Sequence, residues 1–120
     1  MNKNQKIILN LTFPPSTNTY WRHVGNKILL SKKGREYKSA VYAAVKLSGV
    51  KKLPDVDLQI KILAYPPNKR KRDLDNIFKS LFDALGYAGV YSDDSQIKKI
   101  DAEMCGVKKG GFVEVEIMEL

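Results

Sequence analysis

The sequence is poor in the residues that build disulfides, zinc sites and membrane spans. Its 120 residues include one cysteine, Cys105, and one histidine, His23, which excludes an internal disulfide and a zinc site made of several cysteines. No apolar run approaches the roughly 18 residues that a membrane-spanning helix needs. The N-terminal residues M-N-K-N-Q-K-I-I-L-N lack the apolar segment of a secretion signal. We therefore expect a cytoplasmic protein with no membrane partner.

Acidic residues are also scarce relative to basic ones. The 13 Asp and Glu residues stand against 21 Lys and Arg residues, which gives a formal net charge of +8. A hydrophobic fraction of 43% with 28% charged residues is typical of a folded chain rather than a disordered one. The excess of positive charge favours a polyanionic partner, most often nucleic acid. Composition by itself does not separate DNA from RNA or from an acidic membrane surface.

The hydrophobic pattern predicts one compact α+β domain over residues 1–120, without repeats or a linker. Apolar residues that alternate along the chain predict buried strand faces, and apolar residues at helical spacing predict two main helices. Strands are expected at residues 5–13, 57–65, 97–104 and 111–118, and helices at residues 32–48, with Ser31 as its cap, and 74–86. Between the first strand and the first helix we expect a turn-rich loop, followed by a hairpin turn at Gly25–Asn26.

Residues 66–78, P-P-N-K-R-K-R-D-L-D-N-I-F, place four consecutive cations directly before two aspartates. The helix that follows has an apolar face for the core, and Asp75, Lys79 and Asp83 fall on its polar side. Asp73 stands at the expected N-cap. Lys79 follows Asp75 by four residues, so its ammonium can reach the same patch. Cations and carboxylates are thus expected at one end of one helix.

An ordinary structural role explains part of this pattern. Aspartates are favoured at an N-cap and in a first helical turn, and Asp75 with Lys79 can form a surface ion pair. The segment Asp55-Val56-Asp57 has the same spacing at the start of a strand, where we expect it to face solvent. The D-x-D spacing by itself is therefore a weak signal for a metal site.

The segment Y-S-D-D-S-Q, residues 91–96, adds two further carboxylates. Gly86 and Gly89 end the helix and turn the chain, which brings Asp93 and Asp94 back toward that helix. Two or three carboxylates on a basic surface suit Mg²⁺, which prefers oxygen ligands and is often held by few carboxylates together with substrate phosphates. Such an ion can activate a water and neutralise charge on a scissile phosphate. This combination of carboxylates and cations predicts that the partner is a phosphodiester and that the protein cuts it.

The stretch R-D-L-D-N-I-F-K-S-L-F-D-A-L-G-Y-A-G-V-Y-S-D-D-S-Q resembles the RusA family of Holliday junction resolvases. The segments P-P-S-T-N-T-Y-W-R-H, S-K-K-G-R-E-Y and K-K-G-G-F-V-E-V-E-I extend the resemblance over nearly the whole chain. It implies a mixed sheet with helices and a homodimer of phage or prophage origin. It also implies paired symmetric nicks in four-way junction DNA, made with Mg²⁺ or Mn²⁺ during DNA recombination and repair.

The resemblance also implies the site residues. Asp73, Asp75 and Asp94 match the metal-binding carboxylates of the family, and Arg72 and Lys79 match its basic residues near the scissile phosphate. These five form the candidate catalytic set. The candidate DNA-binding residues are Lys69, Arg70, Lys71, Arg72, Lys79, Tyr20 and Arg22.

Several alternatives stay open at this point. Only one of Asp93 and Asp94 is expected to face a metal, because adjacent side chains point in roughly opposite directions; turn chemistry and the resemblance both favour Asp94. Tyr20 and Trp21 either stack on bases opened at the junction or anchor their loop to the core. His23 either contacts a phosphate or serves the structure.

Two other functions compete with junction resolution. One is a non-catalytic basic nucleic-acid-binding phage protein, in which the aspartates are caps and ion pairs. The other is a metal nuclease that acts on flaps or RNA. Cleavage of junction, duplex and single-stranded substrates with and without Mg²⁺ separates all three.

Overall fold

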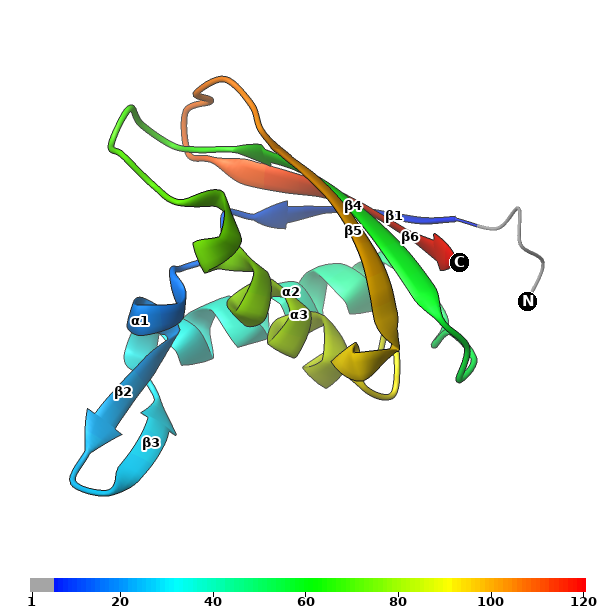
Figure 1. The fold of residues 1–120 in the computed structure, drawn as a ribbon, viewed down its shortest axis with the longest axis horizontal. Coiled ribbons are helices and arrows are strands. Elements are labelled where there is room, and N and C mark those ends of the chain that lie inside the picture. The colour runs from blue at the N-terminus through cyan, green and yellow to red at the C-terminus, as the bar shows by residue number, and fades with distance from the viewer. Residues whose placement is uncertain (1–5) are drawn as a thin grey trace.

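A computed structural model describes residues 6–120, and its main sheet has four strands. They are β1 (Ile7–Thr12), β4 (Leu58–Tyr65), β5 (Ile97–Met104) and β6 (Phe112–Glu119), in the order β1–β6–β4–β5. Strands β4 and β5 run parallel, whereas β6 is antiparallel to both of its neighbours. The sheet is therefore mixed, which confirms the predicted α+β fold class (Figure 1).

The parallel pair β4 and β5 needs a long crossover connection, and residues 66–96 supply it. This crossover contains a 3₁₀ helix, η1 (Leu74–Ile77), then the helix α3 (Phe78–Tyr87), then a second 3₁₀ turn, η2 (Asp94–Gln96). All five residues of the candidate catalytic set lie within it. The topology of the sheet thus determines where a site built from these residues can form.

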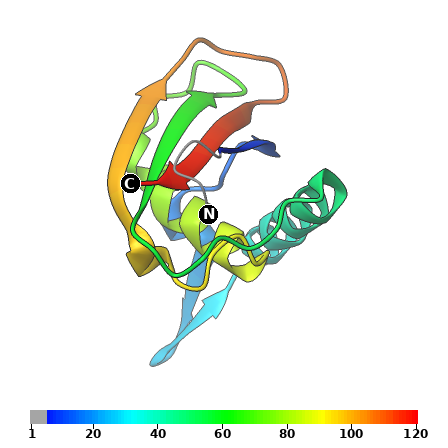
Figure 2. The ribbon, with the colours of Figure 1, turned by 90° about the vertical axis from the view of Figure 1, so that its right-hand side faces the viewer.

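The core lies between one face of the sheet and the helices α2 (Lys32–Ser48) and α3, which lie on the same side of the sheet (Figures 1 and 2). Alternate residues of the central strands are buried, and so is one stripe of each helix. The buried set includes Leu58, Ile60, Ile62, Val113, Val115 and Ile117 from the sheet, and Tyr37, Val41, Val45, Leu81 and Leu85 from the helices. No helix within residues 6–120 is long and apolar enough to cross a bilayer.

Elements with strong local signals have the predicted bounds. Helix α2 begins and ends as predicted, because the Ser31 hydroxyl accepts a hydrogen bond from the Gly34 N–H at 2.9 Å and Gly49 stops the helix with φ of 73°. Strand β5 also coincides with its prediction. The other strands begin and end within two residues of the predicted positions, and Gln5, the first residue of the first predicted strand, lies outside the described residues.

The segment predicted as a turn-rich loop contains more regular structure than expected. Residues 17–20 form a short helix, α1 (Thr17–Tyr20), which leads directly into a two-stranded hairpin of β2 (Trp21–Val24) and β3 (Lys27–Leu30). Gly25 in the hairpin turn has φ of 59°, as the Gly25–Asn26 pair predicted. The hairpin extends away from the sheet (Figure 1).

The helix predicted at residues 74–86 is in fact two elements. The chain first makes the 3₁₀ turn η1, in which the Asn76 N–H donates to the Asp73 carbonyl at 3.1 Å, and only then continues as α3 through Tyr87. No side chain caps either element. Asp75 therefore lies in a 3₁₀ turn rather than in the first turn of an α-helix.

Candidate active site and DNA interface

Asp73 and Asp75 lie where the crossover enters η1. Asp73 is the N-cap residue of η1, with extended backbone (φ −91°, ψ 128°), and Asp75 lies in the first turn. The Asp73 side chain makes no capping hydrogen bond, and both side chains are exposed. A capping role therefore does not account for the Asp73 carboxylate, which is free to bind a ligand.

The two adjacent aspartates at the other end of the crossover have different surroundings. The Asp93 carboxylate accepts a hydrogen bond from the Ser95 N–H at 2.9 Å, and this bond lowers the pKa of Asp93. Partial burial raises the pKa of Asp94, the Asp93 charge raises it further, and the Lys79 ammonium opposes the rise. Asp93 is thus occupied by local backbone, whereas Asp94 lies within the electrostatic influence of Lys79 on α3.

Gln96 anchors the segment that carries Asp94, residues 92–96, which we call the acidic loop. Its side-chain oxygen accepts from the backbone N–H groups of Ser92 and Asp93, at 3.0 and 3.1 Å. Its side-chain nitrogen donates to the carbonyls of Pro54 and Val56, both at 3.0 Å. One side chain therefore joins the acidic loop to the segment before β4 and fixes the position of Asp94.

Sequence reasoning missed this role of Gln96. The available signal was the D-x-x-Q spacing of a capping box, which Asp93 and Gln96 form. Asp55 is exposed, as the sequence predicted, and its carboxylate also accepts a hydrogen bond from the Ser92 hydroxyl at 2.8 Å. Asp55 thus adds a second attachment of the acidic loop to the rest of the protein.

Tyr20 is fully buried, and its hydroxyl donates to the Asp83 carboxylate at 2.5 Å. Burial and then this hydrogen bond raise the pKa of Tyr20. A ring without an exposed face cannot stack on a base, so Tyr20 acts as a structural link between α1 and α3 rather than as a contact to DNA. The carboxylate of Asp83, on the polar side of α3, is thus bound to Tyr20.

Gly34 explains why the segment S-K-K-G-R-E-Y contains a glycine inside a helix. A Cβ atom at this position would lie 2.3 Å from the Tyr20 carbonyl oxygen, which is impossible without a backbone shift. The absent side chain lets the start of α2 pack directly on the end of α1. Because Tyr20 also binds Asp83, three segments far apart in the sequence meet at one residue.

The basic residues line a cleft of about 770 Å³ at the start of the crossover. The segment with the cations, residues 68–73, is the basic loop. Its residues Arg70, Lys71, Arg72 and Asp73 line the cleft together with Lys33 of α2 and Phe13. Positive charge from two elements therefore faces one cavity beside an aspartate, and Lys33 joins the DNA-binding candidates although the sequence did not single it out.

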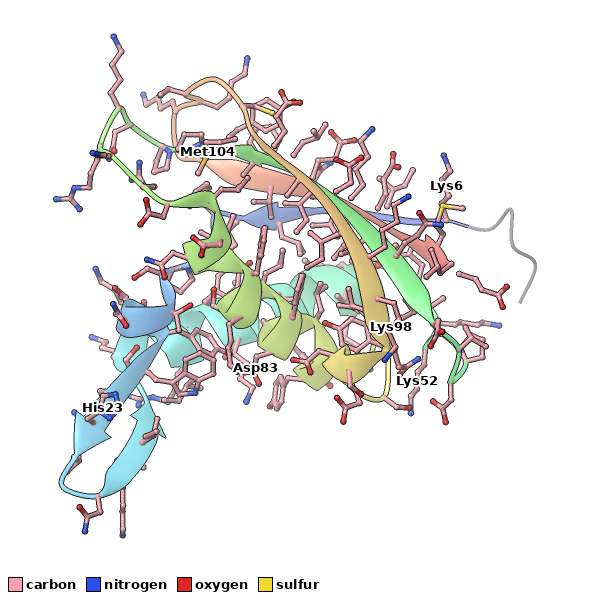
Figure 3. The ribbon with its side chains drawn as sticks, in the orientation of Figure 1. Lys6, His23, Lys52, Asp83, Lys98 and Met104 are labelled. Carbon is pink, nitrogen blue, oxygen red and sulfur yellow. The ribbon has the colours of Figure 1, made fainter. Side chains whose placement is uncertain are left out.

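The other predicted DNA-binding residues lie outside this cleft. Lys69 lines a separate cavity of about 340 Å³ near Met104, and Arg22 lies on the exposed hairpin. Lys79 is exposed on α3 and lines a cavity beneath the hairpin. The cations thus form a broad basic surface around the crossover rather than one compact patch. Figure 3 shows His23 out on the hairpin and Asp83 on α3.

The three predicted metal ligands are not gathered into one preformed cluster. Within residues 6–120, no three His, Cys, Asp or Glu side chains are arranged to hold a metal ion. The donor chemistry nevertheless fits Mg²⁺, since carboxylate oxygens are its usual protein ligands and substrate phosphates commonly complete its coordination. A site of this kind would therefore need DNA to complete it.

Comparison with known proteins identifies the family of the chain. The family model described as endodeoxyribonuclease RusA matches residues 12–118. A crossover junction endodeoxyribonuclease of Enterobacteria phage HK97 is 40% identical, over 100% of this chain and 98% of the relative. Relatives of the same name from Enterobacteria phage 82 and Escherichia coli K12 are 36% and 35% identical, over 93% of both chains in each case. The protein therefore belongs to the RusA family of endodeoxyribonucleases.

Proposed function

We propose that this protein is a magnesium-dependent endodeoxyribonuclease that resolves four-way DNA junctions during recombination and repair. The observation that carries the proposal is its similarity, over nearly the whole chain, to relatives named crossover junction endodeoxyribonucleases. The chemistry of the crossover supports it, because cations suited to phosphates and carboxylates suited to a divalent ion occur within one connection.

The basic residues bind the DNA backbone. Arg70 and Arg72 in the cleft can each bind a phosphate through two N–H groups, and Lys33 adds a point charge from α2. Lys79 lies two residues after η1, and its charge opposes the rise in the pKa of Asp94. We assign Lys79 and Arg72 to the scissile phosphate, and Arg70, Lys71 and Lys33 to the phosphates that flank it.

The carboxylates of Asp73, Asp75 and Asp94 would hold the divalent ion, with a DNA phosphate completing the set. When bound, Mg²⁺ or Mn²⁺ supplies a polarised phosphate and an activated water. The protein contributes the alignment of the carboxylates with the phosphate. It provides Asp94 on an anchored loop, Asp73 in the lining of the basic cleft and Asp75 in the first turn of η1.

We infer that two copies of the chain, each one endonuclease domain over residues 1–120, work as a homodimer in the cytoplasm. A four-way junction has approximate two-fold symmetry, and a dimer presents two identical sites under the same symmetry. Paired symmetric nicks follow from that match. Sedimentation of the protein with and without junction DNA tests this inference, and a complex with a single chain per junction would contradict it.

The main test uses labelled four-way junction, duplex and single-stranded DNA, together with a flap and an RNA of equal length, with and without Mg²⁺. We expect cleavage of the junction alone, only with the metal, and at two symmetric positions. Preferred cutting of the flap or RNA would identify a different nuclease. Tight binding without any cutting in Mg²⁺ or Mn²⁺ would identify a non-catalytic nucleic-acid-binding protein.

A further inference from the structure

The hairpin of β2 and β3 has two chemically different faces. Trp21 pairs with Leu30 and His23 pairs with Ile28 across the strands, so these four side chains share one face. The intervening pairs, Arg22 with Leu29 and Val24 with Lys27, lie on the other face. One face is therefore aromatic and apolar, and the other carries two cations.

The aromatic face covers a cavity of about 360 Å³ above α3. Its lining residues are Thr17, Asn18, Trp21, His23, Ile28 and Lys79. Ile28 is 64% exposed, an unusual position for a large apolar side chain that has no neighbour to cover it. The cavity thus combines a flat aromatic wall, an exposed apolar side chain and a cation.

The aromatic wall is rigid. The Trp21 ring meets the buried Tyr20 ring edge to face, with 4.5 Å between ring centroids and an interplanar angle of 82°. Tyr20 is in turn held by Asp83, and the Thr17 hydroxyl donates to the Asn76 carbonyl at 3.2 Å. The wall is therefore fixed to the crossover that carries the carboxylates, so a group held against Trp21 has a defined position relative to them.

Lys79 belongs both to this cavity and to the surroundings of Asp94. Because Lys79 lines the same cavity as Trp21 and Ile28, a phosphate held by Lys79 would bring its own nucleotide to the hairpin. We propose that the cavity binds an unpaired nucleobase of the strand that is cut, stacked on Trp21 and covered by Ile28. This proposal rests on the function proposed above, and it adds the point where the protein distinguishes an opened junction from paired duplex.

The chemistry of a nucleobase fits this cavity better than that of another occupant. A base has an apolar face for Trp21 and Ile28, and its polar edge can meet the exposed Asn18 amide. Its attached phosphate matches Lys79, and neighbouring phosphates match Arg22 and Lys27 on the outer face of the hairpin. An apolar protein segment would match Trp21 and Ile28 but leave these cations without a partner.

The single tryptophan of the chain makes a direct test possible, because all tryptophan fluorescence comes from Trp21. Metal-free protein is titrated with a four-way junction, and then with the same junction that has abasic sites at the branch-point nucleotides. Both carry the same phosphates. We expect strong quenching by the intact junction and little by the abasic one. Equal quenching by both, or quenching that rises with protein concentration without DNA, overturns the proposal.

A pair of neighbouring substitutions gives a second test. Ile28→Ser changes the face toward the cavity, whereas Leu29→Ser changes the outer face of the same strand, where the side chain is 40% exposed. We expect Ile28→Ser to slow junction cleavage roughly 5-fold or more, the lower limit of base-stacking effects, and Leu29→Ser to stay within about twofold of wild type. Equal losses in both variants overturn the proposal.

Variants of Trp21 extend the test to the wall itself. Trp21→Phe keeps a flat ring and should retain most of the junction cleavage activity. Trp21→Ala should lower the rate of junction cleavage roughly 5- to 150-fold. Equal activity of the two variants would contradict a stacking role. The fluorescence test needs no metal and no cleavage. Its outcome is therefore independent of whether the carboxylates hold a metal, which Asp75→Asn tests separately.

Discussion

The two loops that bring carboxylates to the candidate site are built in different ways. In the acidic loop, Gln96 bonds to Pro54 and Val56, partners 42 and 40 residues away, and Ser92 bonds to Asp55 across 37 residues. In the basic loop, the hydrogen bonds of Arg70 and Arg72 join residues no more than four apart. The acidic loop is therefore fixed by the fold, whereas the basic loop is supported mainly by itself.

This difference means that, of the proposed metal ligands, Asp94 lies on the loop that distant contacts hold in place. Asp94 has a fixed position, but Asp73 follows four exposed or half-buried cations that repel one another. DNA phosphates would remove that repulsion and hold the basic loop in one arrangement. If these aspartates hold a metal as proposed, its binding would be coupled to DNA binding, and cutting would be limited to a correctly bound substrate.

The largest expected effect tests the carboxylates directly. Asp75→Asn removes one negative charge and leaves the basic cleft unchanged. We expect junction cleavage to fall by on the order of 10³-fold, because stabilisation by the metal depends on that charge, while junction affinity changes little. Cleavage rates and gel-shift affinities of the same preparation measure the two effects.

The matched control is Asp57→Asn, the same substitution in the other D-x-D segment. It should leave both cleavage and affinity near those of wild type. If Asp75→Asn cut the junction as fast as Asp57→Asn, the metal-site assignment would be wrong.

The next effect separates the two adjacent aspartates of the acidic loop. Asp94→Asn should lose on the order of 100-fold in cleavage at every Mg²⁺ or Mn²⁺ concentration, since a ligand charge is gone. Asp93→Asn should keep substantial activity, because asparagine also caps the Ser95 N–H. A metal titration of both variants measures this, and the reverse ranking would transfer the ligand role to Asp93.

Elements defined by neighbours in sequence were predictable. The bounds of α2 follow from apolar spacing, the Ser31 cap and Gly49, all within the helix or beside it. The alternating burial of β4 and β6 follows from a period of two. The 3₁₀ turn before α3 was not predictable. A single 3₁₀ turn and a single α turn have similar apolar patterns, and they differ only in whether each N–H bonds to the carbonyl three or four residues earlier.

The features of the site that the sequence did not reveal depend on contacts between segments far apart in the chain. Tyr20 lies in a polar segment, and its burial depends on Asp83, 63 residues away. The anchoring role of Gln96 depends on carbonyls of a segment before β4. Lys33 joins the cleft only because α2 begins beside it. Motif spacing predicted the chemistry of the site, whereas the contacts that hold its residues in place are tertiary.

A smaller effect is expected in the basic loop. Replacing Lys69, Arg70 and Lys71 together by glutamine should weaken binding to junction and duplex alike, by roughly 30-fold at moderate salt. The slope of log affinity against log salt should also become shallower, by an amount that corresponds to at most about three phosphate contacts, because fewer counterions are released. Affinities measured at several salt concentrations test this, and a loss confined to junctions would show that the loop reads structure.

Arg72 should behave differently from these three cations. Its guanidinium donates to the Asn68 and Arg70 carbonyls, each at 3.1 Å, and lies over the Phe13 ring at 5.5 Å. It thus braces the basic loop immediately before Asp73. We expect Arg72→Ala to reduce the cleavage rate of bound junction more than affinity. An effect on affinity alone, as expected for Lys69→Ala, would contradict this division of roles.

The smallest expected effect tests whether the anchored loop matters for activity. Gln96→Ala removes four hydrogen bonds and leaves the Asp94 carboxylate in place. We expect a loss of about 1–2 kcal/mol in the free energy of unfolding and a roughly 10-fold slower cleavage. Because the ligand is displaced rather than removed, excess Mg²⁺ should restore much of the activity, unlike in Asp94→Asn. Gln59→Ala, which removes one hydrogen bond from β4, is the control. Cleavage by Gln96→Ala equal to that of Gln59→Ala would mean that Asp94 does not depend on the anchor.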